Sequence, residues 1–559
     1  MRKNILNTRK WFIPVVLTGM LGGNILSSCT DEMGSVELTK VSGSTDSVAT
    51  VDLAKGMMLE ALTLVHDVRE HKYQYQFNLH VDAYSGYLCV ANNLEGRLPN
   101  TFFMNPDFES GPLANFLWVA RQVIPVMNSA DQLGFPALGA MANILLCYSA
   151  QEITDVYGPM PYLDYRRLKQ DPPMTYMSVQ DIYNQLLKEL KNASDILSSA
   201  NLTSEQVEAI KFFDKIAGGD IKNWVKFANT LRLRIAMHMK KADPITAQRE
   251  AETAIKDGVL LDGDMDIAYN TSGGRHPLFV ISDSWGDTRL NASFENILKR
   301  TDSPLLSTWF DANSSRIIDI NGNETIREPN AEYLGIRAGS AVYSKNDRTD
   351  AYMKFSKLAG GFASKSIALM KVAEALFLRA EGSLYGWNMN GTAQSFYEAG
   401  IKNVLINELG ERIGAIKYRS YIARELPEEI VYTDYFNAKN NFDDTKYMVQ
   451  VGNKWDNDDT NERKLERIMT QKYIANFPMS LESWTDIRRT GYPRLLPAVY
   501  DGGDNSISVI GGGMIRRIPF QLEGSVSRDD VFQTGMPALG GDGDYQGTRL
   551  WWDVDAPNF

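Results

Sequence analysis

Residues 136–162 read PALGAMANILLCYSAQEITDVYGPMPY, and this stretch decides the fold class. Pro136 suits the first turn of a helix, because a proline there gives up no hydrogen bond. An apolar stripe then recurs at intervals of three and four residues, formed by Leu138, Met141, Leu145 and Tyr148. Gly158 and two prolines end the pattern. The stretch therefore predicts one long amphipathic helix.

This helix has an expected partner, and the same arrangement recurs twice more along the chain. Ser178 to Asp181 resembles a helix cap, and apolar residues at helical spacing follow it up to Leu197. Two further pairs are expected at 222–240 with 243–258 and at 366–387 with 392–409. Antiparallel pairs of this size indicate stacked, tetratricopeptide-like hairpins. The expected fold is mainly α.

The spacing of these pairs is irregular, which disfavours a regular solenoid and indicates insertions. Residues 259–345, 430–461 and 499–559 are rich in glycine, asparagine, aspartate, serine and aromatic residues, with no sustained helical period. They are expected to form loops with a few short strands. Long loops in a compact protein tend to be functional or disordered, so these insertions are where a binding surface is sought.

The N-terminus carries an export signal. Four basic residues precede the mostly apolar run 11–26, and Leu26-Ser27-Ser28-Cys29 follows it. The run is shorter than the roughly 20 apolar residues of a membrane-spanning helix. The segment resembles a bacterial lipoprotein signal, in which the thiol of Cys29 is acylated. A plain secretory signal with an incidental cysteine is the alternative.

These features divide the chain into three parts. Residues 1–28 are expected to be a lipoprotein signal peptide, residues 29–50 a flexible tether, and residues 51–559 the folded body with the three insertions, which by length alone could hold about three or four domains. Asp31 and Glu32, just after the cysteine, resemble a surface-export signal of some Gram-negative lineages, although two acids in a linker are also simply well solvated.

Charge and cysteine content exclude some functions. The chain has a formal net charge of −11, and the signal holds four positive and no negative residues, so the mature chain is more acidic still. An acidic surface repels phosphate backbones, so nucleic acid is not an expected ligand. Cys89 and Cys147 lie in apolar stretches and are interpreted as buried free thiols rather than as a disulfide.

Motifs of catalysis are missing from the sequence. The five histidines form no H-E-x-x-H, and there is no nucleophile elbow, P-loop or dinucleotide fingerprint. Residues 262–266 begin like a calcium loop, but Ile267 stands where its sharp turn needs glycine. Residues 540–544 could hold a structural calcium ion, although Gly-Asp runs are more often tight turns. No enzyme activity, cofactor or metal site is expected.

Several compound motifs occur in a fixed order. They are Asp155–Tyr162, Asn223–Arg234, Trp484–Pro493, Arg516–Phe520 and Trp551–Asp553. Together with the signal they make the chain resemble the SusD/RagB family of surface nutrient-binding lipoproteins, over nearly the whole mature length. The resemblance implies mainly structural roles for them. Residues 157–162 would close a helix, Arg488 and Arg489 would form ion pairs, and residues 516–520 would dock the tail.

The resemblance also implies a fold and a role. The fold would be a single α-helical domain over residues 51–559, built on four tetratricopeptide-like hairpins, with the loop-rich segments on one face. The role would be capture of a glycan, or in some branches a peptide, on the outer face of the outer membrane, and its transfer to a SusC-like TonB-dependent transporter. A helical-repeat scaffold without a small ligand and a glycosidase are the competing functions.

Candidate ligand residues follow from the chemistry of sugars. Flat aromatic rings match the C–H faces of a sugar, and Asn, Asp and Arg fix its register by hydrogen bonds. Aromatic residues in loops are therefore favoured over those at helical spacing. The candidates are Trp285, Trp309, Phe310 and Tyr343 in the first insertion, and Asn92, Asn93, Arg97 and Phe103 after the first helix. Trp309 and Phe310 could instead anchor their loop to the core.

Overall fold

The structure is a computed structural model. It describes Val48 and residues 50–94, 99–271, 273–313, 315–326, 332–342, 351–541 and 543–559. The signal peptide 1–28, the lipidation site Cys29 and nearly all of the tether 29–50 lie outside this part of the chain, so the interpretations made of them stay predictions.

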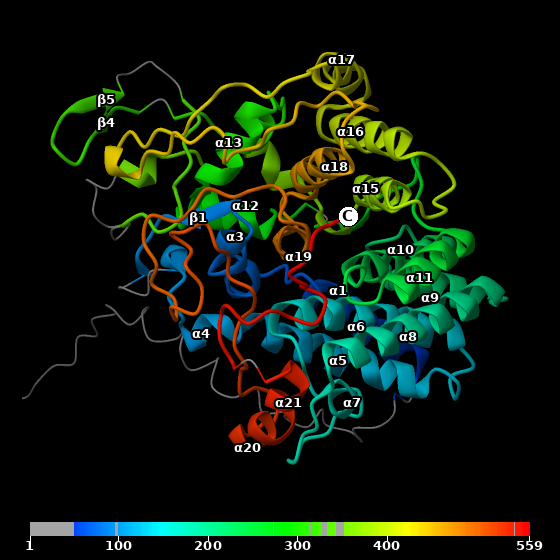
Figure 1. Ribbon diagram of the computed structural model, residues 1–559. Coiled ribbons are helices and arrows are strands. Elements are labelled where there is room, and N and C mark those ends of the chain that lie inside the picture. The colour runs from blue at the N-terminus through cyan, green and yellow to red at the C-terminus, as the bar shows by residue number, and fades with distance from the viewer. Residues whose placement is uncertain are drawn as a thin grey trace, which may run out of the picture.

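Helices gather on one side of the molecule and loops on the other (Figure 1). The helices α5, α6 and α8–α11 form the lower right of the view, while the short hairpin β4–β5 and long connections lie on the left. The expected mainly α fold with a loop-rich face is confirmed.

The long helix of the opening stretch is α6, Pro136–Tyr157. Most of its side chains are buried all round, as suits a central helix. It packs against α5 (Gly111–Ser129) and against α8 (Val179–Ser199), and α5 in turn packs against α1 (Val51–Leu64). The hydroxyl of Ser178 accepts the N–H of Asp181 and caps α8, as predicted.

The second and third predicted pairs are also present. Helices α10 (Ile221–His238) and α11 (Pro244–Asp257) pack together, and Asp243 caps α11. Helices α15 (Val372–Leu384) and α16 (Ala393–Leu409) form the third pair. One boundary was wrong. The segment before α15 is strand β6 (Ile367–Met370), because its backbone pairs with β2 (Ile267–Tyr269).

The remaining long helices are α9, α13 and α17–α19, and the others are single turns. Their bounds are Ser204–Phe213 for α9, Ala292–Arg300 for α13, Glu411–Ile422 for α17, Asn461–Asn476 for α18 and Ser480–Thr490 for α19. The short helices are α2 (Glu70–Tyr73), α3 (Val81–Tyr84), α4 (Pro106–Glu109), α7 (Tyr162–Tyr165), α12 (Pro277–Phe279), α14 (Leu306–Trp309), α20 (Arg528–Asp530) and α21 (Met536–Leu539).

The described strands form three antiparallel pairs, all of them short. β1 (Leu88–Val90) pairs with β3 (Thr288–Leu290), β2 pairs with β6, and β4 (Ile317–Ile318) pairs with β5 (Glu324–Ile326). Four of these strands lie in the insertion 259–345, as expected, but the same insertion also contains α12–α14.

The insertion 499–559 differs from its prediction. Its described residues contain helices α20 and α21 and no strand. The reason is local, because Ser527 and Asp530 form a capping box that starts a helical turn.

The family motifs mostly play the structural roles expected of them. Gly158, at a φ of +87°, ends α6, and Arg517 donates to the carbonyl of Tyr157 in docking the C-terminal segment. Arg489 pairs with Glu381 and Asp486, at 2.5 and 2.6 Å.

Arg488 departs from the expectation of an ion pair. Its guanidinium donates to the carbonyls of Asp155 and Arg516 and lies over the ring of Trp484, 3.6 Å from the centroid. Burial lowers the pKa of Arg488 to about 10. Carbonyl dipoles and aromatic faces therefore stabilise this charge in place of a carboxylate partner.

The largest apolar core runs from Val48 to Trp552 and joins the helical pairs to the loop-rich side. Cys89 and Cys147 are buried free thiols, as predicted. Among the described residues, no helix combines the length and the hydropathy needed to cross a bilayer.

Candidate functional site

Two distant parts of the chain meet at one end of the β1–β3 pair. Val90 lies opposite Thr288, so the residues that follow β1 face those that precede β3. The amide of Asn92 donates to Asp287 Oδ1 at 3.2 Å, and the N–H of Ala91 donates to the Asp287 carbonyl at 2.7 Å. Gln74 holds the other carboxylate oxygen at 3.1 Å. These contacts fix the polar groups at this end.

Trp285 belongs to the same neighbourhood. A π-helical turn, Val280–Ser284, ends at Trp285, whose N–H donates to the Val280 carbonyl. Gly286 follows at a φ of +72°, and a Cβ there would lie 2.9 Å from the Met353 methyl carbon, so this turn requires glycine. The ring of Trp285 is half-buried. We call Asn92, Asn93, Trp285 and Asp287 the ladder end.

The structure therefore brings together three of the residues predicted from the sequence, Asn92, Asn93 and Trp285. Asp287 and Gln74 complete the arrangement, and the sequence analysis missed both. Asp287 is only two residues from Trp285, and this proximity to a candidate aromatic is the signal that could have found it. No sequence signal points to Gln74.

Phe103 lies on a different segment, where the C-terminal insertion packs against residues 99–103. It is 51% exposed. The N–H of Gly502 donates to the Thr101 carbonyl, and the Gln546 amide donates to the Phe102 carbonyl. Two more exposed aromatic residues, Tyr500 and Tyr545, come from this insertion and were missed, because nothing local in the sequence indicates that residues 502 and 546 contact residues 101 and 102.

Trp309 and Phe310 lie in the core, each only 1% exposed. Trp309 is stacked on Phe294 and donates its indole N–H to Glu408 at 2.7 Å, while Phe310 packs against Phe477. Neither ring offers a face to a ligand, so both are removed from the candidate list. Their position matches the alternative interpretation, in which they anchor their loop. Arg97 and Tyr343 lie outside the described residues.

A buried ionic cluster joins α10, α15, α18 and α19. Arg234 makes a bidentate contact with Glu374, at 2.7 and 2.8 Å, and its Nε lies 3.3 Å from Glu482. Lys472 is 2.9 Å from Glu482 and 2.7 Å from Asp486. Glu482 and Asp486 stand with His238 at metal-ligand spacing. The Lys472 ammonium already provides the positive charge there, so the cluster is interpreted as structural.

His238 takes part in the same cluster. Burial alone would lower its pKa, but Glu482 and Asp155, each 3.2 Å away, outweigh burial and raise the pKa to about 9. His238 is therefore a cation at neutral pH, and it helps to balance the carboxylates of the cluster.

Glu109 is a buried acid outside this cluster, and the charge of Asp504 in the insertion 499–559 acts on it. Its side chain is 3% exposed, and its Oε1 has no hydrogen-bond partner. Burial raises the pKa of Glu109 to about 7, and the charge of Asp504 adds to this effect. Ionisation at higher pH places an uncompensated charge inside the protein.

We expect Glu109→Gln to stabilise the protein at pH 8 by about 1–3 kcal/mol relative to wild type. The folded pKa lies above the unfolded value of about 4.3, so the contribution of the protonated group is complete below pH 4 and is lost as the pH rises through 7. Urea unfolding of the variant and of wild type at pH 5 and pH 8 measures the difference in their free energies of unfolding. The control is Glu205→Gln, on the exposed start of α9. Equal pH dependence in Glu109→Gln and wild type would contradict the prediction.

Comparisons with known proteins agree on one relationship. The model of the family described as SusD-like, SusD and RagB outer membrane lipoprotein, matches residues 39–553. A solved chitin-binding SusD homologue from Flavobacterium johnsoniae shares 33% identity, with a TM-score of 0.76, over 90% of this chain and 100% of its own. No curated protein matches the chain.

Solved relatives from Bacteroides have the same fold. A SusD homologue from Bacteroides thetaiotaomicron VPI-5482 is 26% identical, with a TM-score of 0.76, over 90% of this chain and 99% of its own. One from Bacteroides uniformis ATCC 8492 is also 26% identical, with a TM-score of 0.74, over the same shares of the two chains.

Proposed function

Since the chain belongs to the SusD and RagB family of outer membrane lipoproteins, we propose that it captures an oligosaccharide at the cell surface and passes it to a SusC-like TonB-dependent transporter. The family and its chitin-binding relative support glycan binding at the outer membrane. The lipid on Cys29, the outward orientation and the transporter partner are parts of the proposal.

The ladder end is the observation that carries the proposed binding function. It presents the half-buried side chains of Trp285 and Asn93, and the buried, mutually hydrogen-bonded Asn92, Asp287 and Gln74 hold this end of the strand pair in place. An aromatic ring supplies apolar area at low entropic cost, and a few fixed polar groups supply orientation. This combination suits a sugar, which has apolar C–H faces and hydroxyls at its edge.

An oligomer of N-acetylglucosamine is the first ligand to test. The relative described as chitin-binding shares a third of its residues with this chain. Chitin is neutral, and the net charge of −11 disfavours polyanions. We expect binding without cleavage, with a dissociation constant on the order of micromolar to millimolar, which lets the cargo be released.

We expect Trp285→Ala to weaken binding of the N-acetylglucosamine hexamer at least tenfold, a loss of about 1.4 kcal/mol. The affinity should fall because the variant lacks the indole ring that would stack against the C–H face of a sugar. Isothermal titration of purified protein measures it. Phe532→Ala removes another exposed aromatic residue, 71% exposed, and serves as the control because it lies in the π-helical turn between α20 and α21, remote from the ladder end.

Other outcomes would change the assignment. Unchanged affinity in Trp285→Ala would place the glycan elsewhere. Binding of mixed peptides and of no glycan in a panel would favour the peptide-capturing alternative. Sugar cleavage in proportion to purified protein would show an enzyme. Purification from membranes in several mild detergents tests the transporter, which should remain attached as a much larger β-barrel protein.

A further inference from the structure

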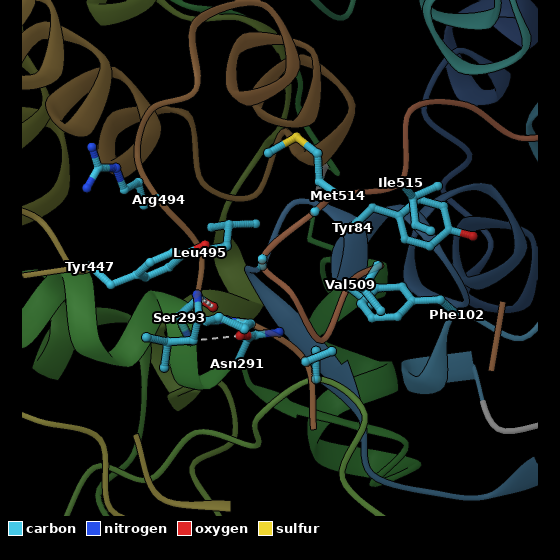
Figure 2. Close-up of a pocket in the computed structure, with 18 of the residues that line it drawn as sticks. Tyr84, Phe102, Asn291, Ser293, Tyr447, Arg494, Leu495, Val509, Met514 and Ile515 are labelled. Atoms are coloured by element: carbon cyan, nitrogen blue, oxygen red, sulfur yellow. Dashed lines mark hydrogen bonds between the residues drawn. The ribbon is translucent and has the colours of Figure 1, made fainter. Parts of the chain in front are cut away.

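A cavity of about 270 Å³ lies between α3, the start of α13 and the loops 491–498 and 509–515 (Figure 2). Its inner wall is formed by buried residues, among them Phe102, Val509 and Ile515. Gly491 and Arg494 at the rim are exposed to solvent, so the cavity can be reached from outside. It is distinct from the ladder end, whose residues do not line it.

Three polar side chains in this cavity have unused hydrogen-bonding capacity. The hydroxyl of Tyr447 makes no hydrogen bond with a described residue, and Figure 2 shows its ring extending from the left of the cavity toward Leu495. Ser293 is buried and accepts the N–H of Leu496 at 3.0 Å, but its own O–H has no acceptor in the described chain. Arg494 donates to no described group.

The position of Tyr447 depends on a glycine. Gly512 has a φ of +84°, and a Cβ on it would lie 2.8 Å from the Tyr447 hydroxyl oxygen. Any other residue at 512 would both strain the backbone and crowd that hydroxyl. The chain therefore keeps this hydroxyl accessible beside the Gly512 backbone.

The lining fits a sugar ring better than an anion. Apolar walls from Leu495 and Met514 match C–H faces, and the free donors match sugar hydroxyls. Arg494 is the one charged side chain among the described lining residues, and it lies at the exposed rim, so the interior of the cavity presents no cation to a carboxylate. The cavity is large enough for one sugar ring, and its buried inner wall, which includes Phe102, Val509 and Ile515, would stop a chain from passing through it.

We propose that this cavity binds a single neutral sugar residue, and so recognises an end or a branch of the glycan rather than the middle of its chain. The inference rests on the proposed glycan-binding function and adds a second contact to the ladder end. Tyr447 and Ser293 hydrogen-bond the ring hydroxyls, Arg494 closes the rim, and Leu495 and Met514 contact the apolar face.

The test uses two cavity variants and one control. Tyr447→Phe deletes only the unpaired hydroxyl, and Leu495→Trp fills the space. Tyr545→Phe deletes the hydroxyl of an exposed tyrosine that does not line the cavity. The probes are N-acetylglucosamine, glucose, galactose and mannose up to 50 mM, and the N-acetylglucosamine hexamer. Binding is followed by saturation-transfer NMR and calorimetry, and melting is compared with wild type.

We expect the wild-type protein to bind at least one of the monosaccharides. Tyr447→Phe should weaken the affinity for that sugar about three- to tenfold, and Leu495→Trp should abolish its binding. Tyr545→Phe should bind it as wild type does. Hexamer binding that is lost in Trp285→Ala and unaffected by both cavity variants would overturn this inference and leave the proposed function intact. Failure of wild type to bind any of the four monosaccharides would also overturn it. Failure to bind any glycan at all would overturn both.

Discussion

Arg234→Met should lower the free energy of unfolding by about 3–5 kcal/mol. Arg234 is 1% exposed and is the bidentate partner of Glu374, with Glu482 close to its Nε. Removal of the guanidinium leaves two carboxylates facing each other in the interior, and burial already raises the pKa of Glu374. Methionine keeps much of the side-chain volume of arginine, so the loss of stability is due mainly to removal of the positive charge. Chemical denaturation at pH 7 measures it.

Arg249→Met is the matched control, because Arg249 is 63% exposed and its contact with Glu250 at 3.4 Å is a surface pair worth little. The double variant Arg234→Met, Glu374→Leu should recover part of the loss, since it removes one of the stranded charges. A loss in Arg234→Met no larger than in Arg249→Met would show that the cluster contributes nothing to stability.

Cys29→Ala should move nearly all of the protein from the membrane fraction to the soluble fraction. The sequence around Cys29 predicts acylation, and stable anchoring by lipid takes more than one acyl chain. Without the thiol, no acyl chain can be attached. Membrane fractionation with immunoblotting measures the shift, and the intact mass of the wild-type protein should exceed that of the polypeptide by the lipid.

Thr30→Ala is the control for this change, because it alters the next residue and leaves the thiol in place. Cys29→Ala protein that stays with the membrane after a high-salt wash would contradict lipid anchoring. An unmodified thiol at residue 29 in wild type would contradict it directly.

Helices with local signals were predictable from the sequence. The stripe on α6, the Ser178 cap of α8 and the Asp243 cap of α11 depend on residues three or four positions apart, so they are visible in any short window. Strand β6 was not predictable, because its hydrogen-bond partner is β2, about a hundred residues earlier. An isolated window of apolar residues does not reveal a partner strand.

The candidate site was predictable in part for the same reason. The chemistry of sugars favours aromatic and amide side chains in loops, and Trp285, Asn92 and Asn93 are residues of this kind. Trp285 and Trp309 cannot be distinguished in the sequence, because both are tryptophans in one insertion and only its contacts with residues such as Phe294 bury Trp309. Phe103, Tyr500 and Tyr545 likewise needed the hydrogen bonds that join residues 101, 102, 502 and 546.

The pairing of β1 with β3 has a consequence for the order of folding. The Thr288 hydroxyl donates to the Cys89 carbonyl across 199 residues of chain, and the hydroxyl of Tyr87 contacts that of Ser483 across 396. Contacts of such long range form slowly, since a large loop must close first. The hydrophobic strand Leu88–Val90 is synthesised about two hundred residues before Thr288–Leu290, and it cannot pair until that partner strand follows. The ladder end is therefore expected to assemble late in folding, and the unpaired edge of strand Leu88–Val90 stays open to wrong pairing until then.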